Sequence, residues 1–165
     1  MTTVAVTGHM DLTDESVPLV RAALRRLLDR YAREVGEELV GVSCIAAGAD
    51  SLFAEALLEV GGRLVVVIPS HDYRRTRVAP DHAVTFDRLV RAATEVHRMP
   101  VETASRAAYE AANRVMLGRA DRLVAVWNGA PPGGAGGGTA DVVIEARAAG
   151  IPVEVVWPEG TARRG

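Results

Sequence analysis

The sequence predicts an α/β protein with a three-layer, Rossmann-like, doubly wound sheet of about six mostly parallel strands. Short apolar runs alternate with longer segments in which apolar residues recur at helical spacing. The run LVVVI at 64–68 has no polar alternation, as expected for a parallel strand that is buried on both faces. Parallel strands need helical crossovers, so the alternation indicates an open sheet covered by helices on both faces.

Six segments are predicted to be strands because each is short, apolar and mostly rich in β-branched residues. They span residues 3–7, 38–46, 64–68, 95–99, 123–127 and 153–157. The helices are predicted from apolar residues at a period of 3.6. They span residues 17–33, 51–60, 82–93, 102–119 and 139–149, and glycines at 61, 62 and 150 favour the ends of two of them.

The domain organisation is expected to be simple. No internal repeat or linker divides the chain, so residues 1–158 are predicted to form a single domain. Residues 70–80 are predicted to be a polar loop and residues 129–138 a glycine-rich loop. The remaining residues, 159–165, are expected to be a flexible C-terminal tail.

The composition excludes several kinds of site. All 19 basic residues are arginine, so a Schiff-base lysine and a P-loop lysine are excluded. A net charge of −2 and 4% aromatic residues argue against a nucleic-acid partner. The only cysteine, Cys44, leaves no internal disulfide or cysteine-rich zinc site. The histidines lack the spacing of metal ligands, so neither a metal nor a cofactor is expected.

No segment suggests a membrane. The N-terminus lacks a basic region followed by an apolar one, so no signal peptide is indicated. The longest strongly apolar run, 64–69, is too short to cross a bilayer. We therefore expect a cytoplasmic protein without a membrane partner.

Two loops at the carboxyl ends of predicted strands carry candidate ligand contacts. In the first loop these are Thr7, Gly8 and His9, because glycine lets backbone approach a ligand and histidine can donate or accept a hydrogen bond. An ordinary turn with an exposed histidine is the alternative. The second loop offers Gly48, Ala49, Asp50 and Ser51, of which Asp50 or Ser51 could instead simply cap the following helix.

A third loop is a candidate phosphate site. It joins a buried strand to a helix, where consecutive glycine amides and the helix dipole can hold an anion. The alternative is a flexible glycine linker. Its candidate ligand residues are Asn128, Gly129, Gly136, Gly137, Gly138 and Thr139.

Cationic side chains supply further candidates. Arg74, Arg75 and Arg77 could clamp phosphate oxygens, and Tyr73 beside them could stack on a base. Arg114 is another possible anion contact. A solvated charged loop is the alternative for the first three arginines.

Four blocks, taken in order, give the chain a resemblance to a known family. They are VAVTGHMDL, IAAGADSLFAEAL, YEAANRVMLGRADRLVAVWNG and GGGTADVVIEARAAGIPV. Over nearly its whole length the chain resembles the SLOG superfamily, a Rossmann-like group that includes the LOG proteins and DNA-processing protein A. It is most similar to small stand-alone and YpsA-like members, which are described as predicted nucleotide-binding proteins.

The resemblance departs from the enzymatic branch of that superfamily. LOG phosphoribohydrolases carry the signature P-G-G-x-G-T-x-x-E and an arginine on the preceding helix. When its threonine is placed on Thr139, the glutamate position falls on Val142 and the arginine position on Ala112. A relocated carboxylate, above all Asp141, would have to serve in catalysis, and Asp50 and Glu110 are alternatives.

These observations predict a protein that binds a nucleotide or nucleotide-derived small molecule, without efficient catalysis. The first alternative is N-glycosidic hydrolysis of a nucleoside 5′-monophosphate. A second is a structural or single-stranded DNA-binding role by analogy with DNA-processing protein A. The resemblance also implies a homodimer or higher homo-oligomer, for which the alanine-rich helix face at 104–116 is a candidate interface. Packing of these alanines on the sheet is the alternative.

Overall fold

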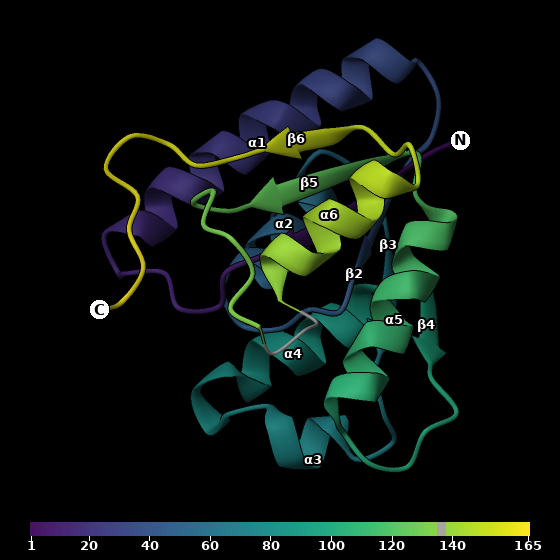
Figure 1. The fold of residues 1–165 in the computed structure, drawn as a ribbon. Helices are drawn as coiled ribbons and strands as arrows, with labels where there is room; N and C mark the ends of the chain where they lie inside the picture. The colour runs from purple at the N-terminus through teal and green to yellow at the C-terminus, as the bar shows by residue number, and fades with distance from the viewer. Residues whose placement is uncertain (135–137) are drawn as a thin grey trace.

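The predicted fold class is confirmed. The computed structural model, which describes residues 1–134 and 138–165, contains one sheet whose strands all run parallel in the order β4-β3-β2-β1-β5-β6 (Figure 1). The strands are β1 (Thr2–Gly8), β2 (Leu39–Ser43), β3 (Arg63–Ile68), β4 (Glu95–Arg98), β5 (Arg122–Val126) and β6 (Val153–Val155). The helices are α1 (Ser16–Val35), α2 (Ala49–Glu59), α3 (Tyr73–Arg77), α4 (Pro80–Ala92), α5 (Arg106–Arg119) and α6 (Thr139–Ala148).

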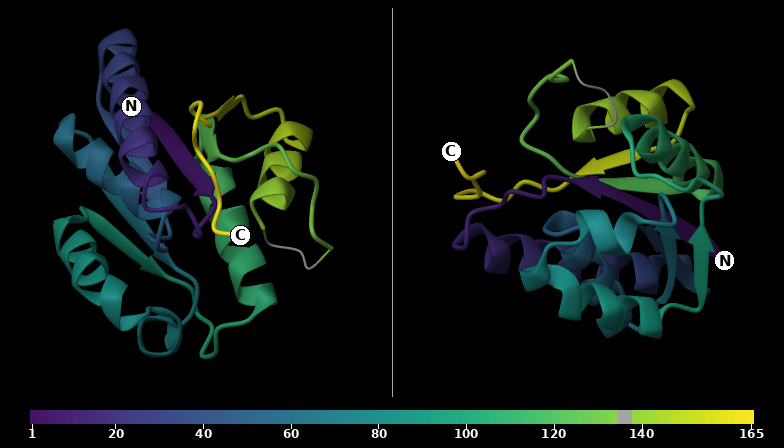
Figure 2. Two further views of the ribbon diagram at one scale, coloured as in Figure 1. Left: turned by 90° about the vertical axis from the view of Figure 1, so that its left-hand side faces the viewer. Right: turned by 90° about the horizontal axis from the view of Figure 1, so that it is seen from below.

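Helices cover both faces of the sheet. α1, α2 and α4 lie on one face, and α5 and α6 lie on the other (Figure 2). Because side chains alternate along a strand, β1 supplies both cores: Val4 and Val6 pack toward the first set of helices, and Ala5 toward the second. Each strand in the middle of the sheet is therefore apolar on both sides.

The winding of the chain reverses beside β1. The strands from β1 to β4 are added one after another on one side, and α5 then carries the chain back to β5 on the other side of β1. The carboxyl ends of β1 and β5 consequently flank the switch point, where open α/β sheets bind ligands.

Two predicted boundaries were wrong around residues 70–105. The polar loop predicted at 70–80 contains a short helix, α3. α5 begins at Arg106 rather than at residue 102 because the Ser105 hydroxyl caps the helix by accepting a hydrogen bond from the Ala108 amide at 3.1 Å. The residues just before it are tied to the Asp72 carboxylate, which accepts from the Ala104 amide at 2.8 Å.

The second predicted strand was too long, because β2 ends at Ser43. The Ser43 hydroxyl accepts a hydrogen bond from the Ile45 amide at 2.9 Å and donates to the Asp50 carbonyl at 3.1 Å. The chain turns here, and Ile45 adopts a φ of 47°, a left-handed conformation that β-branched residues rarely adopt.

The last residues lie against the loop between β1 and α1, although the sequence had suggested a flexible tail. Arg163 forms a β-bridge with Leu12, and the Thr13 amide donates to the Ala162 carbonyl at 3.1 Å. The Ser16 hydroxyl accepts a hydrogen bond from the Ala162 amide at 2.8 Å. These contacts use backbone groups, which sequence patterns do not report.

The alanine-rich side of α5 is used within the chain. Ala104, Ala108 and Ala112 are all buried, and Ala112 belongs to the core between α5, α6 and the sheet. The expected homo-oligomer stays a prediction. Among the helices that the structure describes, none is long and apolar enough to cross a membrane.

Candidate functional site

A cavity of about 680 Å³ opens at the carboxyl edge of the sheet, at the switch point. Its walls come from the ends of β1, β2 and β3, from the loop after β5, from α2, α3, α5 and α6, and from the last residues of the chain. Nine of the predicted site residues line it: Thr7, Gly8, His9, Asp50, Tyr73, Arg77, Gly138, Thr139 and Asp141.

Two of the predicted glycines allow the first two loops to pack closely against each other. A Cβ atom on Gly8 would lie 2.4 Å from the Ala49 Cβ, and one on Gly48 would lie 2.7 Å from the His9 carbonyl oxygen. Gly48 also has a φ of 81°, and the Ala49 amide donates to the His9 carbonyl. Gly48 and Ala49 therefore lie beneath the first loop and do not line the cavity.

His9 is a buried, neutral histidine at the end of β1. Burial lowers its pKa, and the nearby Arg163 guanidinium lowers it further, against the opposing effects of Asn128 and Asp11. Its Nε2 atom lies 3.2 Å from both the Asn128 backbone nitrogen and the Asn128 Oδ1 atom. The ring thus joins the loop after β1 to the loop after β5.

The loop after β5 is shaped by its own side chains. Asn128 Oδ1 accepts from the Ala130 amide at 3.0 Å, and Trp127 Nε1 donates to the Ala130 carbonyl at 3.0 Å. Asn128 and Gly129, both predicted ligand contacts, do not line the cavity, whereas Trp127 does. Asn128 supports the site through His9 and Ala130.

Asp50 faces the cavity from the first turn of α2. Protein surrounds the carboxyl except where the cavity opens, and this desolvation raises its pKa to about 7. The Ala46 amide works in the opposite direction. Among the described side chains no cation pairs with Asp50, so this carboxyl can change its charge near neutral pH.

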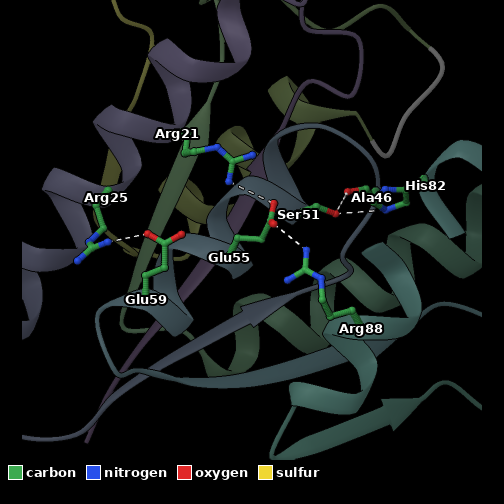
Figure 3. A network of polar contacts seen from close by, with 8 residues as sticks. All are labelled: Arg21, Arg25, Ala46, Ser51, Glu55, Glu59, His82 and Arg88. Atoms are coloured by element: carbon green, nitrogen blue, oxygen red, sulfur yellow. Dashed lines mark hydrogen bonds and ion pairs between the residues drawn. The ribbon is translucent and has the colours of Figure 1, made fainter. Parts of the chain in front are cut away.

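Ser51, although predicted to contact a ligand, is turned away from the cavity. Its hydroxyl donates to the Ala46 carbonyl at 2.7 Å, and His82 Nε2 lies 3.2 Å from it (Figure 3). The same His82 nitrogen lies 3.0 Å from the Ile45 carbonyl. Ser51 and His82 therefore fix the strained loop that leads from β2 to Asp50.

A half-buried carboxylate ties the neighbouring helices together. Glu55 accepts from Arg88 of α4 at 2.8 Å and lies 3.5 Å from Arg21 of α1 (Figure 3). With 19% of its side chain exposed, Glu55 is the most buried acid in this network. It joins α1, α2 and α4 behind the cavity.

The amino end of α6 forms another wall. Gly138, Thr139 and Ala140 line the cavity there, and the first amides of a helix have no acceptor within it. Asp141 does not reach freely into the cavity, because its Oδ2 atom accepts from the Gly138 amide at 3.1 Å. Gly136 and Gly137, also predicted here, lie outside the described residues.

Only one of the predicted arginines lines the cavity. Arg77 does so and forms no ion pair with any residue in the described part of the chain. Arg74 is held by Asp87 through two hydrogen bonds of 3.0 and 2.9 Å, while Arg75 points to solvent. Arg114 is exposed because Asn113, one residue earlier, occupies the cavity side of α5.

Aromatic side chains supply apolar wall. Tyr73 lines the cavity but is 6% exposed, and its ring packs near Phe86 and Tyr109 at centroid distances of 6.1 and 6.2 Å. Burial raises the pKa of its hydroxyl, which stays protonated. Tyr73 is therefore a fixed wall residue, and Tyr109 and Trp127 are the more accessible rings.

Several lining residues escaped the sequence reasoning: Asp11, Tyr109, Asn113, Trp127 and Arg163. The positions of Tyr109, Asn113 and Met116 follow helical spacing, so the side of α5 that faces the cavity could have been found from one of them. No local signal marks Arg163. Over residues 1–134 and 138–165, no group of three possible metal ligands lies together.

No model of a known protein family matches the chain, and neither does any curated protein. Solved structures do match. DNA processing protein A from Streptococcus pneumoniae superposes with a TM-score of 0.67 at 20% identity, over 97% of this chain and 52% of that protein. The chain therefore spans about half the length of that relative.

Two further structures share the architecture. DNA processing protein A from Helicobacter pylori, described with a single-stranded DNA binding mode, has a TM-score of 0.65 at 15% identity, over 98% of this chain and 68% of that one. The Chlamydomonas rheinhardtii Moco carrier protein has a TM-score of 0.54 at 16% identity, over 93% and 74%. The chain shares the fold of these solved proteins.

The fold explains the place of the cavity. In this domain the loops after β1, β2 and β5 meet at one edge, as the order of the four sequence blocks implied. The two positions of the LOG signature lie elsewhere: Val142 and Ala112 are buried in the core between α5, α6 and the sheet. A side chain at either position faces the core rather than the cavity.

Proposed function

We propose that this SLOG-type domain binds a nucleotide or a nucleotide-derived small molecule in the cavity at the switch point. The observation that supports the proposal is that three features line one cavity of about 680 Å³. They are the amino end of α6, the cation Arg77, which has no ion-pair partner among the described residues, and the aromatic wall. Cavities of this size accommodate small molecules of nucleotide dimensions.

The phosphate is assigned to the amino end of α6. Helix amides and the helix dipole favour an anion there, and Thr139 adds a hydroxyl. The chain has no lysine, so backbone amides and arginine are its means of holding phosphate. Trp127 and Tyr109 offer apolar surface for a base.

The solved relatives support the same class of ligand. The Helicobacter pylori protein, as its description states, binds single-stranded DNA, which is a chain of nucleotides. At the level of chemistry a nucleotide site and a DNA site share phosphate recognition. The sequence argument against a nucleic-acid partner for this chain stays a prediction.

Replacing Arg77 by alanine is expected to weaken binding of nucleoside 5′-monophosphates by about tenfold or more, since a charged hydrogen bond contributes roughly 1.5–3 kcal/mol. Calorimetric titration with AMP, GMP, CMP and UMP measures this. Arg75→Ala is the matched control, because Arg75 lies on the same helix outside the cavity. Absence of binding by the unmodified protein to all four nucleotides would reject the proposal.

A second candidate function is hydrolysis of the N-glycosidic bond of a nucleoside 5′-monophosphate. The observation in its favour is that two carboxyl groups, Asp50 and Asp141, line the same cavity. A glycosidase needs carboxyl groups at the anomeric carbon, either to protonate the leaving group or to direct water. Release of free base from AMP would support this function.

Asp141→Asn separates the two functions. A carboxylate at the amino end of α6 repels phosphate, so the neutral amide is expected to tighten AMP binding about threefold to tenfold, by roughly 1 kcal/mol. If Asp141 were a catalytic residue, base release would instead fall by orders of magnitude. Titration and a base-release assay on the same variant distinguish these outcomes.

A further inference from the structure

The last residues of the chain form part of the cavity wall. Besides the bridge to Leu12, the Arg164 amide donates to the Asp11 carbonyl at 2.7 Å. Asp11 is the third residue after β1 and follows His9 and Met10. The segment 161–164, here called the closing segment, is thereby fixed beside the loop after β1.

One side chain of the closing segment turns toward the cavity. Arg163 lines it, and its Nε atom donates to Asp11 Oδ1 at 2.8 Å. The neighbouring Arg164 lies outside the lining and pairs with Asp14 at 3.3 Å. Of these two adjacent arginines, Arg163 therefore lines the cavity and Arg164 does not.

The ion pair leaves Arg163 able to bind a second anion. A guanidinium has five N–H donors arranged as a fork, and Asp11 is hydrogen-bonded through the Nε edge. Arg163 is 42% exposed on its side chain, so its remaining donors are accessible. Asp11 fixes the direction of the guanidinium, which reduces the loss of side-chain entropy on binding an anion.

In the part of the chain that the structure describes, no other charged cation lines this end of the cavity. His9, the nearest basic group, is kept neutral by burial and by Arg163 itself. Arg77 lies two strands away, after β3, while Arg163 lies beside β1. The cavity therefore has one arginine on the side of β3 and another on the side of β1.

We propose that Arg163 is an anion-binding residue of this cavity, which contacts a second phosphate group of the bound nucleotide, away from the phosphate held by α6 and Arg77, and couples ligand binding to docking of the closing segment. The inference rests on the proposed function, because it concerns the same site. It adds a ligand contact from a part of the chain that sequence patterns indicated to be a tail.

The test compares Arg163→Ala with Arg164→Ala. Both changes keep the backbone contacts of the closing segment, and each removes one exposed ion pair. Titrations use adenosine 3′,5′-bisphosphate, with AMP as the probe that lacks the second phosphate. Arg163→Ala is expected to lower the affinity for the bisphosphate at least tenfold and to leave AMP binding unchanged, whereas Arg164→Ala changes neither.

Hydrogen exchange gives a readout that a purely structural role would not produce. In the unmodified protein, nucleotide is expected to slow exchange of the Thr13 and Arg164 amides, which hold the closing segment. In Arg163→Ala this ligand-dependent slowing is lost, even at saturating nucleotide.

The outcomes separate the two proposals. If the unmodified protein binds nucleotides and Arg163→Ala binds them equally well, the role of Arg163 is refuted and the proposed function stands. An equal loss for AMP and the bisphosphate also refutes the contact with the second phosphate. If the unmodified protein binds none of the nucleotides, both proposals fail.

Discussion

Gly8→Ala is expected to lower the free energy of unfolding by about 3 kcal/mol, since inserting a methyl group where neighbours cannot move is strongly destabilising. The new Cβ would lie 2.4 Å from the Ala49 Cβ, 2.9 Å from the Val126 Cβ and 3.0 Å from the Val126 carbonyl oxygen. All three atoms belong to or adjoin the backbone. These close contacts can therefore be relieved only if β1, β5 or α2 shifts as a unit.

Gly118→Ala is the matched control for this change. Gly118 lies in α5 with no atom within 4 Å of the added Cβ, so alanine only improves helix propensity. That variant is expected to gain roughly 0.5–1 kcal/mol. Denaturant unfolding measures both variants, and equal stability of the two would contradict the contacts assigned to Gly8.

Gly8→Ala is also expected to displace part of the cavity wall. Gly8 immediately precedes His9, and the Ala49 amide bonded to His9 is held at the same contact. A shift there displaces the wall that carries Thr7, His9 and Asp11. Gly8→Ala should therefore weaken nucleotide binding even in the fraction that remains folded.

Sequence patterns predicted what depends on local chemistry. The unbroken apolar run at 64–68 predicted β3 as a buried parallel strand, and the alternation of strands and helices predicted the doubly wound sheet. Because parallel strands end at the same edge, the loops beginning at Thr7 and at Asn128 could be placed together. His9 and Asn128 are in contact there.

The missed features depend on rotation and on distant contacts. Arg114 and Asn113 differ by one step of a helix, about 100°, and this step decides which of them lines the cavity. Ser51 is of a type that often contacts ligands, yet its hydroxyl already donates a hydrogen bond to the Ala46 carbonyl. Arg163 reaches the cavity through a pairing with Leu12 that no local pattern encodes.

Asp50→Asn is expected to remove a pH dependence from both stability and ligand binding. Asp50 has a pKa of about 7 in the folded protein, against an ordinary value of 3.8. Folding therefore takes up a proton between about pH 4 and pH 7, and the free energy of unfolding falls as the pH rises through this window. A fully buried group would change the free energy of unfolding by about 1.4 kcal/mol for each unit of pKa difference. Because the Asp50 carboxyl partly faces the cavity, solvent screening reduces the expected loss of stability to roughly 2 kcal/mol in total.

Two neighbours of Asp50 do not titrate in this window. Burial raises the pKa of both the Cys44 thiol and the Tyr73 hydroxyl, so both stay neutral. Burial lowers the pKa of His9, whose titration contributes equally to the variant and to the unmodified protein and so cancels in their comparison. The variant should therefore match the unmodified protein near pH 4 and exceed its stability by roughly 2 kcal/mol at pH 8.

Asp87→Asn is a suitable control for stability. The Arg74 guanidinium lowers the pKa of Asp87, so that carboxylate stays charged from pH 5 to pH 8 and its loss should shift stability equally throughout. Unfolding curves at several pH values measure all three proteins. Identical pH profiles for Asp50→Asn and the unmodified protein would show that Asp50 does not hold its proton.

Ligand binding should respond in the same direction. Above pH 7 the Asp50 carboxylate places a negative charge in the cavity, so AMP is expected to bind more weakly at pH 8 than at pH 6. The phosphate of AMP titrates near pH 6 as well, and comparing Asp50→Asn with the unmodified protein at each pH cancels this contribution. A growing advantage of the variant with rising pH is the result that Asp50 requires, because the variant lacks the negative charge that Asp50 gains as the pH rises.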